Sequence, residues 1–582
     1  YIMDTVDVAG DKCVDLAFVP VNSQSYGFTG RLYITLDGNY AVKKFLLNTP
    51  ANINLNWVDK LRIEQEFKRM PDSTWVLANE NTYVNFYIVK GAQQLYAHQL
   101  RNFDKYQFDV QNADSIFGLL GTIHELPEAT AQTDTFWIHN RHVPLKEKES
   151  ALDDLLAQLR KVPAFNVIIK TAEILITGYI PTTADKDKSK FDFGPMNTTF
   201  SANHLEGFRM RVGGMTTANL NPHWFGSGYL AYGVNDRKLK YNAKLTYSVN
   251  KKKYHEGESP VNNISAIQEY DVYTPGQDFL FTSKDNMFVA WKVGEPVTMM
   301  QYIRKTMLQY QKEWLNGLTL TTWARNENNE AAGTLRYDRY DADGTLTNLK
   351  SFTNTELGTQ LRFAPGERAY NGREGKNSLF NLSKDAPVFK LSHQMGLKNV
   401  LGSDFNYNHT EISAEKRIWL SSFGHIDALV TAGKVWDKVP FPLLIMPNTN
   451  QSITIQPQAF NMMRALEFVS DQYVSFYFTY YMKGWILNRI PGVKWLRLRE
   501  VISFSGFYGG LTDKNNPALD PTGLYRFPEG TSPMGRTPYL EASVGLENIF
   551  KILRIDYYRR LTYLDQPNIK KGGVRIALRF SF

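Results

Sequence analysis

Cysteine is almost absent from this chain, which has a single one, Cys13, in 582 residues. A lone cysteine excludes an internal disulfide framework and any metal site built from several thiolates. We therefore expect Cys13 to be a small buried apolar residue. Long hydrophobic runs are also missing, because 167–180 contains two charged residues and 441–446 is too short for a transmembrane helix. If the chain meets lipid, it must do so with strands, since only helices and closed barrels satisfy backbone polar groups in hydrocarbon.

Catalytic signatures are missing as well. The sequence has no Gly-x-Ser-x-Gly elbow, and Gly375-Lys376 lacks the upstream glycine of a phosphate-binding loop. His124-Glu125 is not followed by the second histidine of a zinc-binding helix. The segment 341–344 resembles a calcium loop, but Arg339 occupies its first ligand position, so we interpret it as a hairpin turn. We expect no enzymatic activity, no metal and no cofactor. A membrane-embedded hydrolase is the alternative.

A strong charge imbalance is absent too. The net charge is +8, from 66 Lys and Arg against 58 Asp and Glu, and the basic residues are dispersed among the acidic ones. Because they form no basic stripe, we expect no nucleic-acid partner. The chain starts at Tyr1 without a charged or apolar leader, so we expect a signal peptide and further sequence to precede it.

Aromatic residues, in contrast, are plentiful, with 32 Tyr and 35 Phe. From His204 onward apolar residues, many of them aromatic, recur at alternate positions in segments of about ten residues, as in strands of a transmembrane barrel. In 239–249, for example, the leucines, tyrosines and valine fall on one face and the lysines, threonine and serine on the other. The same pattern recurs in 473–482, 540–547 and 574–582.

A large soluble β-sandwich is the alternative, because its strands alternate in the same way. The end of the chain favours the barrel. Phe580 and Phe582 close a strand of alternating apolar residues and resemble the signal that the outer-membrane assembly machinery reads. We therefore predict a mostly β chain with a 16-stranded transmembrane antiparallel β-barrel over 196–582.

Turn residues and alternation define the expected barrel strands, with a periplasmic C-terminus, short periplasmic turns and long outer loops. The predicted strands span 205–213, 226–234, 238–249, 265–274, 286–293, 298–312, 317–328, 353–365, 386–398, 407–421, 426–436, 472–484, 496–508, 538–547, 552–562 and 574–582. The longest outer loop would be 437–470. The connection 365–386 is unusually long for the periplasmic side.

The first part of the chain has a different pattern. Residues 1–110 alternate as in a water-exposed antiparallel β-meander, with Asp37-Gly38 supplying a tight hairpin. Residues 111–195 predict a short helical connector and linker, since 146–161 carries leucines at helical spacing and 166–177 is a second helical stretch. We expect the N-terminal part to be a periplasmic domain.

Four stretches carry a resemblance to a Bacteroidetes outer-membrane family of unknown function, the domain of unknown function 5686 family. They are GFTGRLYITLDGNYAVKK (27–44), LEGFRMRVGG (205–214), FNMMRALEFVSDQYVSFYF (460–478) and LNRIPGVKWLRLREV (487–501). Members often begin with a carboxypeptidase-regulatory-like domain, which this sequence lacks. The resemblance implies a bacterial outer-membrane location.

The loop 437–470 carries a second resemblance, to the barrels of the outer-membrane insertase and surface-antigen superfamily. Those have sixteen strands and a long loop between strands eleven and twelve that folds into the lumen and bears an Arg-Gly-aromatic tip. Pro440-Phe441-Pro442 and Arg464 look like the beginning and tip of that loop, but Arg464 is followed by Ala465-Leu466. The resemblance implies a plugged lumen and leaves an insertase mechanism open.

A third resemblance concerns the Gly-x-Leu-Tyr-Ile strand at 30–34. This strand in an antiparallel meander is similar to half-barrel lipoprotein carriers of the periplasm. The resemblance implies a curved apolar face that holds acyl chains. The alternative is a periplasmic scaffold domain with an ordinary core.

Charged residues on the predicted inner face are the candidate functional residues. They are Asp471, Glu541, Glu547, Arg554, Asp556, Arg560, Arg575 and Arg579. One interpretation is a set of structural cross-strand ion pairs. The other adds Arg464 and Glu467 of the long loop, with Arg464 pairing to a wall carboxylate as a latch that keeps the lumen closed.

Two functions fit this sequence. The first is a non-enzymatic outer-membrane barrel that assists export, assembly or insertion of protein or lipid, with a plugged lumen and an accessible seam between first and last strands. The second is an anchoring or receptor-like barrel that partners a nutrient-uptake or secretion complex, with a firmly closed seam. Both predict outer-membrane lipid as a partner, and other outer-membrane or periplasmic proteins as further partners.

Overall fold

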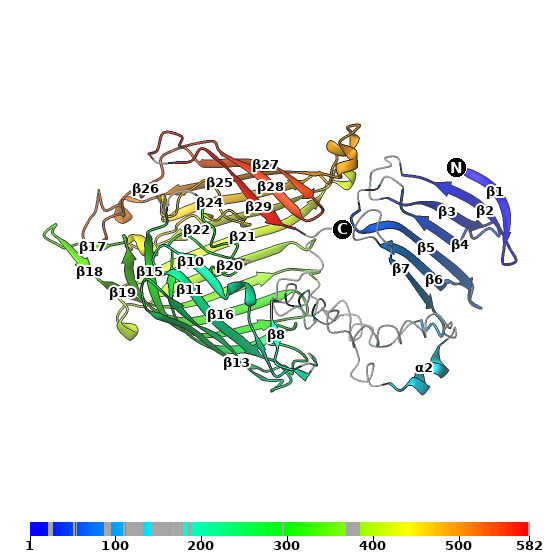
Figure 1. Ribbon diagram of the computed structural model, residues 1–582, viewed down its shortest axis with the longest axis horizontal. Coiled ribbons are helices and arrows are strands. Elements are labelled where there is room, and N and C mark those ends of the chain that lie inside the picture. The colour runs from blue at the N-terminus through cyan, green and yellow to red at the C-terminus, as the bar shows by residue number, and fades with distance from the viewer. Residues whose placement is uncertain are drawn as a thin grey trace.

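The computed structural model describes the chain except for 21–26, 51–52, 54, 87–94, 109–110, 112–131, 142–166, 168–170, 172–173, 175–177, 184, 186–187, 281, 294–295, 368–384, 568 and 580–582. The protein is mostly β-structure, as the sequence predicts, with two large antiparallel sheets (Figure 1). No helix in the described ranges is long and apolar enough to cross a membrane.

The N-terminal sheet is a seven-stranded antiparallel meander in chain order. Its strands are β1 (Ile2–Val8), β2 (Asp11–Phe18), β3 (Thr29–Thr35), β4 (Val42–Asn48), β5 (Val58–Arg69), β6 (Trp75–Phe86) and β7 (Leu95–Asn102). The predicted hairpin at Asp37-Gly38 joins β3 to β4. Gly38 has a positive φ of 89°, and the Asp37 carboxylate accepts hydrogen bonds from the Thr35 hydroxyl and the Asn39 backbone N–H.

One face of this sheet is apolar, because directly opposed residues of neighbouring strands point the same way. Its members are Val14, Leu16, Leu32, Ile34, Phe45, Leu47, Leu61, Ile63 and Val84. All of them are only half-buried. Among the described residues up to 108, the buried hydrophobic side chains are Cys13, Ile53 and Val76. The expectation of a buried Cys13 is confirmed, and burial raises the pKa of its thiol.

The connection between the two sheets contains helix α2 (Asp134–Asn140). Thr133 caps its N-terminus, since the Thr133 hydroxyl accepts a hydrogen bond from the backbone N–H of Phe136 at 3.3 Å. The predicted helix 146–161 lies outside the described residues, as does most of 166–177.

The second, large sheet has 18 strands, and all of them lie within the described residues of 180–578. They are β8 (Ile180–Pro181), β9 (Phe191–Phe193), β10 (Phe200–Asn203), β11 (Gly207–Thr216), β12 (Trp224–Gly233), β13 (Leu239–Ser248), β14 (Asn262–Tyr273), β15 (Met299–Glu313), β16 (Leu318–Gly333), β19 (Ser351–Phe363), β20 (Val388–Gly396), β21 (Tyr407–Trp419), β22 (His425–Val435), β24 (Gln472–Tyr481), β25 (Arg499–Gly510), β27 (Tyr539–Ile549), β28 (Leu553–Arg560) and β29 (Gly572–Leu578).

Smaller elements lie in the connections. Two short strand pairs are β17 (Tyr337–Tyr340) with β18 (Leu346–Leu349), and β23 (Phe468–Val469) with β26 (Ser532–Pro533). The 3-10 helices are η2 (Met196–Thr198), η4 (Val400–Gly402), η5 (Ser421–Phe423), η6 (Phe441–Leu443), η7 (Leu487–Arg489), η8 (Lys494–Leu496) and η9 (Asp513–Asn515).

One predicted barrel strand is wrong. Residues 286–293 form no strand and lie in the connection from β14 to β15, where Val289 and Ala290 each donate a backbone hydrogen bond to Asn286 in a turn. Its apolar side chains do not form one buried face, since Val289 is buried whereas Met287, Phe288 and Trp291 are exposed. In its place, the unpredicted β9 and β10 both pair with β11. The strands before 298 therefore run opposite to the predicted direction.

The large sheet buries its polar face and exposes its apolar face. In β13, Leu239 and Leu245 are 57% and 52% exposed, whereas Lys240 and Thr246 are completely buried. In β28, Tyr557 is 50% exposed, whereas its alternating neighbours Arg554, Asp556 and Arg560 are buried. A soluble sandwich would have the reverse arrangement. This inverted pattern is typical of a sheet whose outer face meets lipid and whose inner face lines an enclosed interior.

The N-terminal sheet contacts the large sheet at the end where β27 turns into β28, here called the proximal end (Figure 1). The amide of Asn56 donates to the Asn548 side chain at 2.6 Å, and the Arg497 guanidinium donates to the backbone carbonyl of Leu55 at 2.7 Å. The Lys551 ammonium lies 4.6 Å from the ring centre of Trp57. The opposite end, which carries the β17–β18 hairpin, is called the distal end.

Candidate functional site

The residues between β22 and β24, 436–471, fold against the inner face of the large sheet and are called the inner loop. The loop contributes to two buried apolar clusters. In the first, Phe441 and Leu466 pack with Tyr337 of β17 and Tyr407 of β21. In the second, Phe460, Met463 and Phe468 pack with Phe507 of β25 and Tyr539 of β27. The loop therefore occupies the interior, as the sequence predicts for a loop in this position.

A buried ion pair fixes the inner loop to the sheet. Both side chains, Glu467 of the loop and Arg560 of β28, are completely buried. The Arg560 guanidinium donates two hydrogen bonds to the Glu467 carboxylate, at 2.7 and 3.0 Å. A bidentate contact of this kind is among the strongest charged hydrogen bonds. The loop–sheet ion pair thus exists, but the loop supplies the carboxylate and the sheet supplies the arginine.

Arg464 has a different place from the one the sequence predicts. Its backbone N–H donates to the Glu467 carboxylate at 2.9 Å, and its guanidinium lies beside Gly530 of the next distal loop. Within the described ranges Arg464 makes no ion pair, and its Nε is buried without a hydrogen-bond partner. The latch with Arg464 on a wall carboxylate is therefore not formed. The reason is local: the turn at 464–467 points Glu467, rather than Arg464, at the sheet.

Two further wall side chains hold the tip of the inner loop. The carboxylate of Glu541, on β27, accepts hydrogen bonds from the backbone N–H groups of Asn461 and Met462 at 2.8 and 2.9 Å. The Arg575 guanidinium, on β29, donates to the Asn461 carbonyl at 2.6 Å. Together with Arg560, these side chains hold the loop by its backbone and by one carboxylate.

The remaining candidates do not contact the tip of the inner loop. Asp471, at the end of the loop, accepts hydrogen bonds from the Thr512 backbone and from Asn515, and so joins the inner loop to the loop after β25. Closer to the proximal end, Arg554 and Asp556 form a bidentate pair at 2.8 and 2.6 Å, and Arg579 lies 3.3 Å from Glu547. These last four residues form ion pairs within the wall.

The outer edge of the last strand is bonded to the inner loop. The Ile576 N–H donates to the Ile453 carbonyl at 2.9 Å, and the Ile455 N–H donates to the Ile576 carbonyl at 2.8 Å. β8 comes next to β29 in the order of the sheet, but in the described residues the residue-by-residue register joins β29 to β28 alone. The Ile453 N–H in turn donates to the carbonyl of Trp291, in the β14–β15 connection.

That connection reaches the first strands. The Met287 N–H donates to the carbonyl of Asn197, between β9 and β10, at 2.9 Å. Backbone hydrogen bonds therefore run from β29 through 453–455 and 287–293 to the first strands. We call the segments 287–293 and 451–455 the seam segments.

Sequence reasoning missed a second buried charge cluster, on the first strands of the large sheet. Arg209 of β11 contacts the carboxylates of Glu206, Asp271 and Asp285, at 2.8, 2.7 and 3.2 Å. Lys240 of β13 contacts Glu206 at 2.7 Å. All of these side chains are buried. The signal was present in the sequence, because the alternation in 239–249 places Lys240 on the polar face of its strand.

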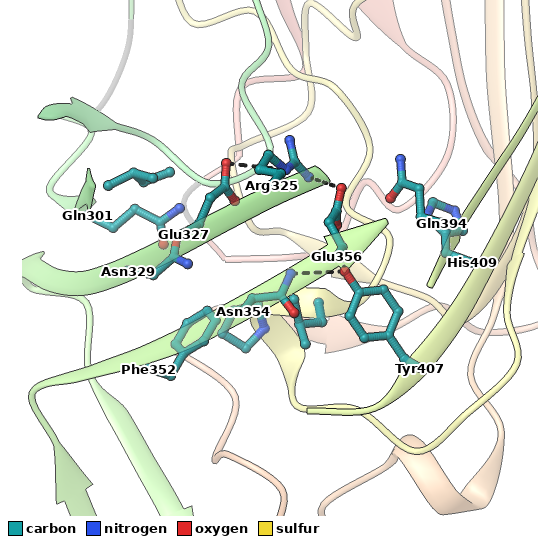
Figure 2. A pocket seen from close by; sticks show the side chains of 13 residues that line it. Gln301, Arg325, Glu327, Asn329, Phe352, Asn354, Glu356, Gln394, Tyr407 and His409 are labelled. Atoms are coloured by element: carbon teal, nitrogen blue, oxygen red, sulfur yellow. Dashed lines mark hydrogen bonds and ion pairs between the residues drawn. The ribbon is translucent and has the colours of Figure 1, made fainter. Parts of the chain in front are cut away.

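A polar cavity of about 220 Å³ lies between the inner loop and strands β15, β16, β19, β20 and β21 (Figure 2). At its centre, the Arg325 guanidinium contacts Glu356 at 2.8 Å and Glu327 at 3.5 Å. Amide side chains surround these charges, and Pro442 and Leu443 of the inner loop cover one side. In the part of the chain that the structure describes, no group of His, Cys, Asp and Glu is placed to bind a metal ion.

Phe580 and Phe582, the predicted assembly signal, lie outside the described residues. The strand that precedes them has the expected orientation, since Val574 and Leu578 are 49% and 61% exposed and Arg575 is buried.

The model of the "Family of unknown function (DUF5686) C-terminal domain" matches residues 172–515. Three of the four stretches that carry the family resemblance in the sequence, 205–214, 460–478 and 487–501, lie within this match, so that prediction is confirmed. No curated protein matches the sequence.

Several solved structures are similar to this chain at low identity. One is BamA from Haemophilus ducreyi lacking POTRA domains 1-3, with a TM-score of 0.42, 9% identity, and coverage of 71% of this chain and 78% of that chain. A second is CdiB from Acinetobacter baumannii, with a TM-score of 0.32, 11% identity and coverage of 65% and 57%. A third is the copper transporter OprC, with a TM-score of 0.25, 9% identity and coverage of 98% and 69%.

Proposed function

This chain belongs to the DUF5686 family of unknown function, and we propose that it is an outer-membrane barrel protein that assists the assembly or insertion of protein or lipid at that membrane. In this proposal β9 and β10 together form the first of sixteen strands and β29 the last. The N-terminal sheet lies in the periplasm at the proximal end. The protein is not an enzyme and uses no cofactor, and its partners are outer-membrane lipid and the proteins or lipids that it delivers.

The membrane assignment rests on the reversed burial of the large sheet. Its outer face carries exposed leucine, valine, tyrosine and phenylalanine side chains from β11 through β29, whereas its inner face buries Arg209, Lys240, Arg554 and Arg560. In water such an outer face would be an aggregation hazard, but against acyl chains it is favourable. Exposed apolar residues alternate with buried polar ones along β13, β25, β27 and β28, which a lipid-facing barrel requires.

The assembly role rests on the bonding of the β29 edge. In a closed anchoring barrel, a full ladder of hydrogen bonds would join the first and last strands. The described part of β29 instead bonds its outer edge to the inner loop through the N–H and carbonyl of Ile576. An edge held by a loop can be released when the loop moves, and a free edge is a template for pairing with another strand.

A reversible disulfide between the seam segment and β29 tests this role. Thr454 and Ile576 form a parallel bridge, so Thr454→Cys/Ile576→Cys in a Cys13→Ser background should lock the loop onto the edge. We expect the oxidised variant to reduce the delivery of outer-membrane proteins and lipoproteins to the level of a deletion strain. Reduction of the disulfide should restore it. The measurement is quantitative proteomics of the outer membrane.

The matched control is a disulfide inside an ordinary ladder. Tyr557 and Val574 are opposed on β28 and β29, so Tyr557→Cys/Val574→Cys locks two strands without touching the seam. Full activity of this control together with loss in the seam variant supports the proposal. Full activity of the oxidised seam variant would contradict it and favour the anchoring or receptor-like barrel.

A further inference from the structure

The cavity beside the inner loop has a lining that follows from strand register. Arg325, Glu327 and Asn329 occupy alternate positions of β16, directly opposite Glu356, Asn354 and Phe352 of β19. Alternate residues share a face, so this face of both strands points into the cavity (Figure 2). The cavity is thus built by two neighbouring strands and completed by β15, β20 and β21.

The charged groups in the cavity contact one another, although the Nε of Arg325 has no hydrogen-bond partner among the described residues. Besides its ion pair with Arg325, the Glu356 carboxylate accepts hydrogen bonds from the Trp323 indole at 2.9 Å and the Tyr407 hydroxyl at 2.7 Å. Glu327 lies within 3.5 Å of the same guanidinium. Because one arginine lies between two carboxylates, the cavity carries an excess of one negative charge, which disfavours an anionic ligand.

Two neutral polar side chains of the cavity have atoms without a hydrogen-bond partner in the described ranges. The Asn354 amide donates a hydrogen bond to the Tyr407 hydroxyl at 3.0 Å. In the described part of the chain the side-chain carbonyl oxygen of Asn354 has no partner, although the residue is only 3% exposed. The Nε2 of His409 likewise has no partner there. The amides of Asn329 and Gln394 also line the cavity (Figure 2). Buried polar groups without partners are rare in proteins and point to a bound molecule or water.

The geometry points to a ligand that is rich in hydroxyl groups and carries no negative charge, and we propose that this cavity binds a sugar of monosaccharide size. Amides donate and accept hydrogen bonds at once, as hydroxyl groups do, and the rings of Phe352 and Tyr407 offer an apolar surface for the C–H face of a sugar ring. The volume of about 220 Å³ suits one such ring. Binding here would also contact Pro442 and Leu443, so the ligand would rest against the inner loop.

Saturation-transfer-difference NMR on the full chain in detergent tests this site. The probes are glucose, galactose and N-acetylglucosamine, with glucosamine and glucuronate as charged counterparts. We expect a saturable signal from at least one neutral sugar or from cationic glucosamine, and a weaker one from anionic glucuronate. The variant Asn329→Leu/Gln394→Leu should weaken binding roughly tenfold, because it removes two hydrogen-bonding amides.

The matched control is Asn328→Leu, one position along β16 and on the opposite face, where the amide donates to the Thr353 hydroxyl. It should bind as the unaltered protein does. If Asn329→Leu/Gln394→Leu fails to fold by circular dichroism, the single variant Gln394→Leu takes its place. The absence of any signal from the neutral sugars and glucosamine, equal binding of glucuronate, or unchanged binding in the variant would each overturn the proposal and leave a cavity filled by water.

Discussion

In the N-terminal sheet, the ion pair between Lys44 and Glu66 lies at the surface, with side chains 26% and 46% exposed, whereas in the large sheet the pair between Arg560 and Glu467 is completely buried. Both sheets are antiparallel and both alternate polar and apolar residues. The N-terminal sheet leaves its apolar face half-buried and its charges in water. The large sheet encloses its charges and exposes its apolar residues.

This difference shows that alternation identifies a strand but does not tell whether its apolar face meets lipid or other parts of the protein. The same period of two places charged residues on one face in both sheets. The contribution of these charged residues to stability depends on whether that face is enclosed. A charge pair shielded from water interacts more strongly, and breaking it leaves a costly unpaired charge. The predictions below test whether the two sheets respond differently to equivalent changes.

The largest expected difference concerns the two ion pairs. Arg560→Met should destabilise the folded large sheet by about 3–5 kcal/mol, because it leaves the Glu467 carboxylate buried without its partner. Lys44→Met should cost at most about 1 kcal/mol. Urea unfolding in detergent, followed by tryptophan fluorescence, measures both. The double variant Arg560→Met/Glu467→Leu should recover much of the loss, and equal midpoints for the two single variants would contradict the comparison.

A charge on the outer face should have the next largest effect. Leu245 is 52% exposed on β13 of the large sheet, and Leu36 is 43% exposed beside the β3–β4 hairpin. In a lipid bilayer Leu245→Arg should cost about 2–4 kcal/mol if it lies near the midplane. Leu36→Arg, in water, should stay within about 0.5 kcal/mol. The measurement is reversible unfolding from lipid vesicles, and a harmless Leu245→Arg would argue that this face meets water.

A smaller effect is expected from the close approach at Gly545. A Cβ there would lie 2.0 Å from a carboxylate oxygen of Asp556, which is held in place by Arg554. Gly545→Ala should therefore lower the free energy of unfolding by about 1–3 kcal/mol, because the added methyl group overpacks the inner face. Gly226→Ala is the control, since the nearest atom to its Cβ would be the Thr216 methyl at 3.8 Å. Thermal unfolding compares them, and equal midpoints would mean that the Arg554–Asp556 pair yields easily.

The smallest effect is the pH response of the N-terminal sheet. The hydrogen bond from Lys44 lowers the pKa of the Glu66 carboxyl. The stability that the ionised Glu66 carboxyl contributes is therefore fully present above the unfolded pKa of about 4.3. It is lost as the pH falls through the lower pKa of the folded state. Hydrogen exchange of β4 and β5 between pH 6 and 3 should show protection falling at the acid end, by no more than about 1 kcal/mol. Lys44→Met should remove this dependence.

Much of the fold could be predicted from alternation and turn chemistry. The strands around 239–248, 472–481 and 553–560 lie within a few residues of their predicted positions. The segment 286–293 could not be assigned correctly, because a short apolar run has the same sequence pattern whether it forms a strand or a turn. The two pieces β9 and β10 were missed since each is too short to show a period.

Alternation alone shows which residues of the large sheet share a face, because a period of two is a property of the backbone. It also predicts that Glu541, Arg560 and Arg575 face the interior, and the long loop adds Glu467. Which of these side chains contact one another depends on the three-dimensional packing. Glu467, rather than Arg464, faces Arg560, and the β29 edge bonds to 453–455. Such contacts join residues far apart in the chain, and they depend on how a long loop packs, which no local pattern encodes.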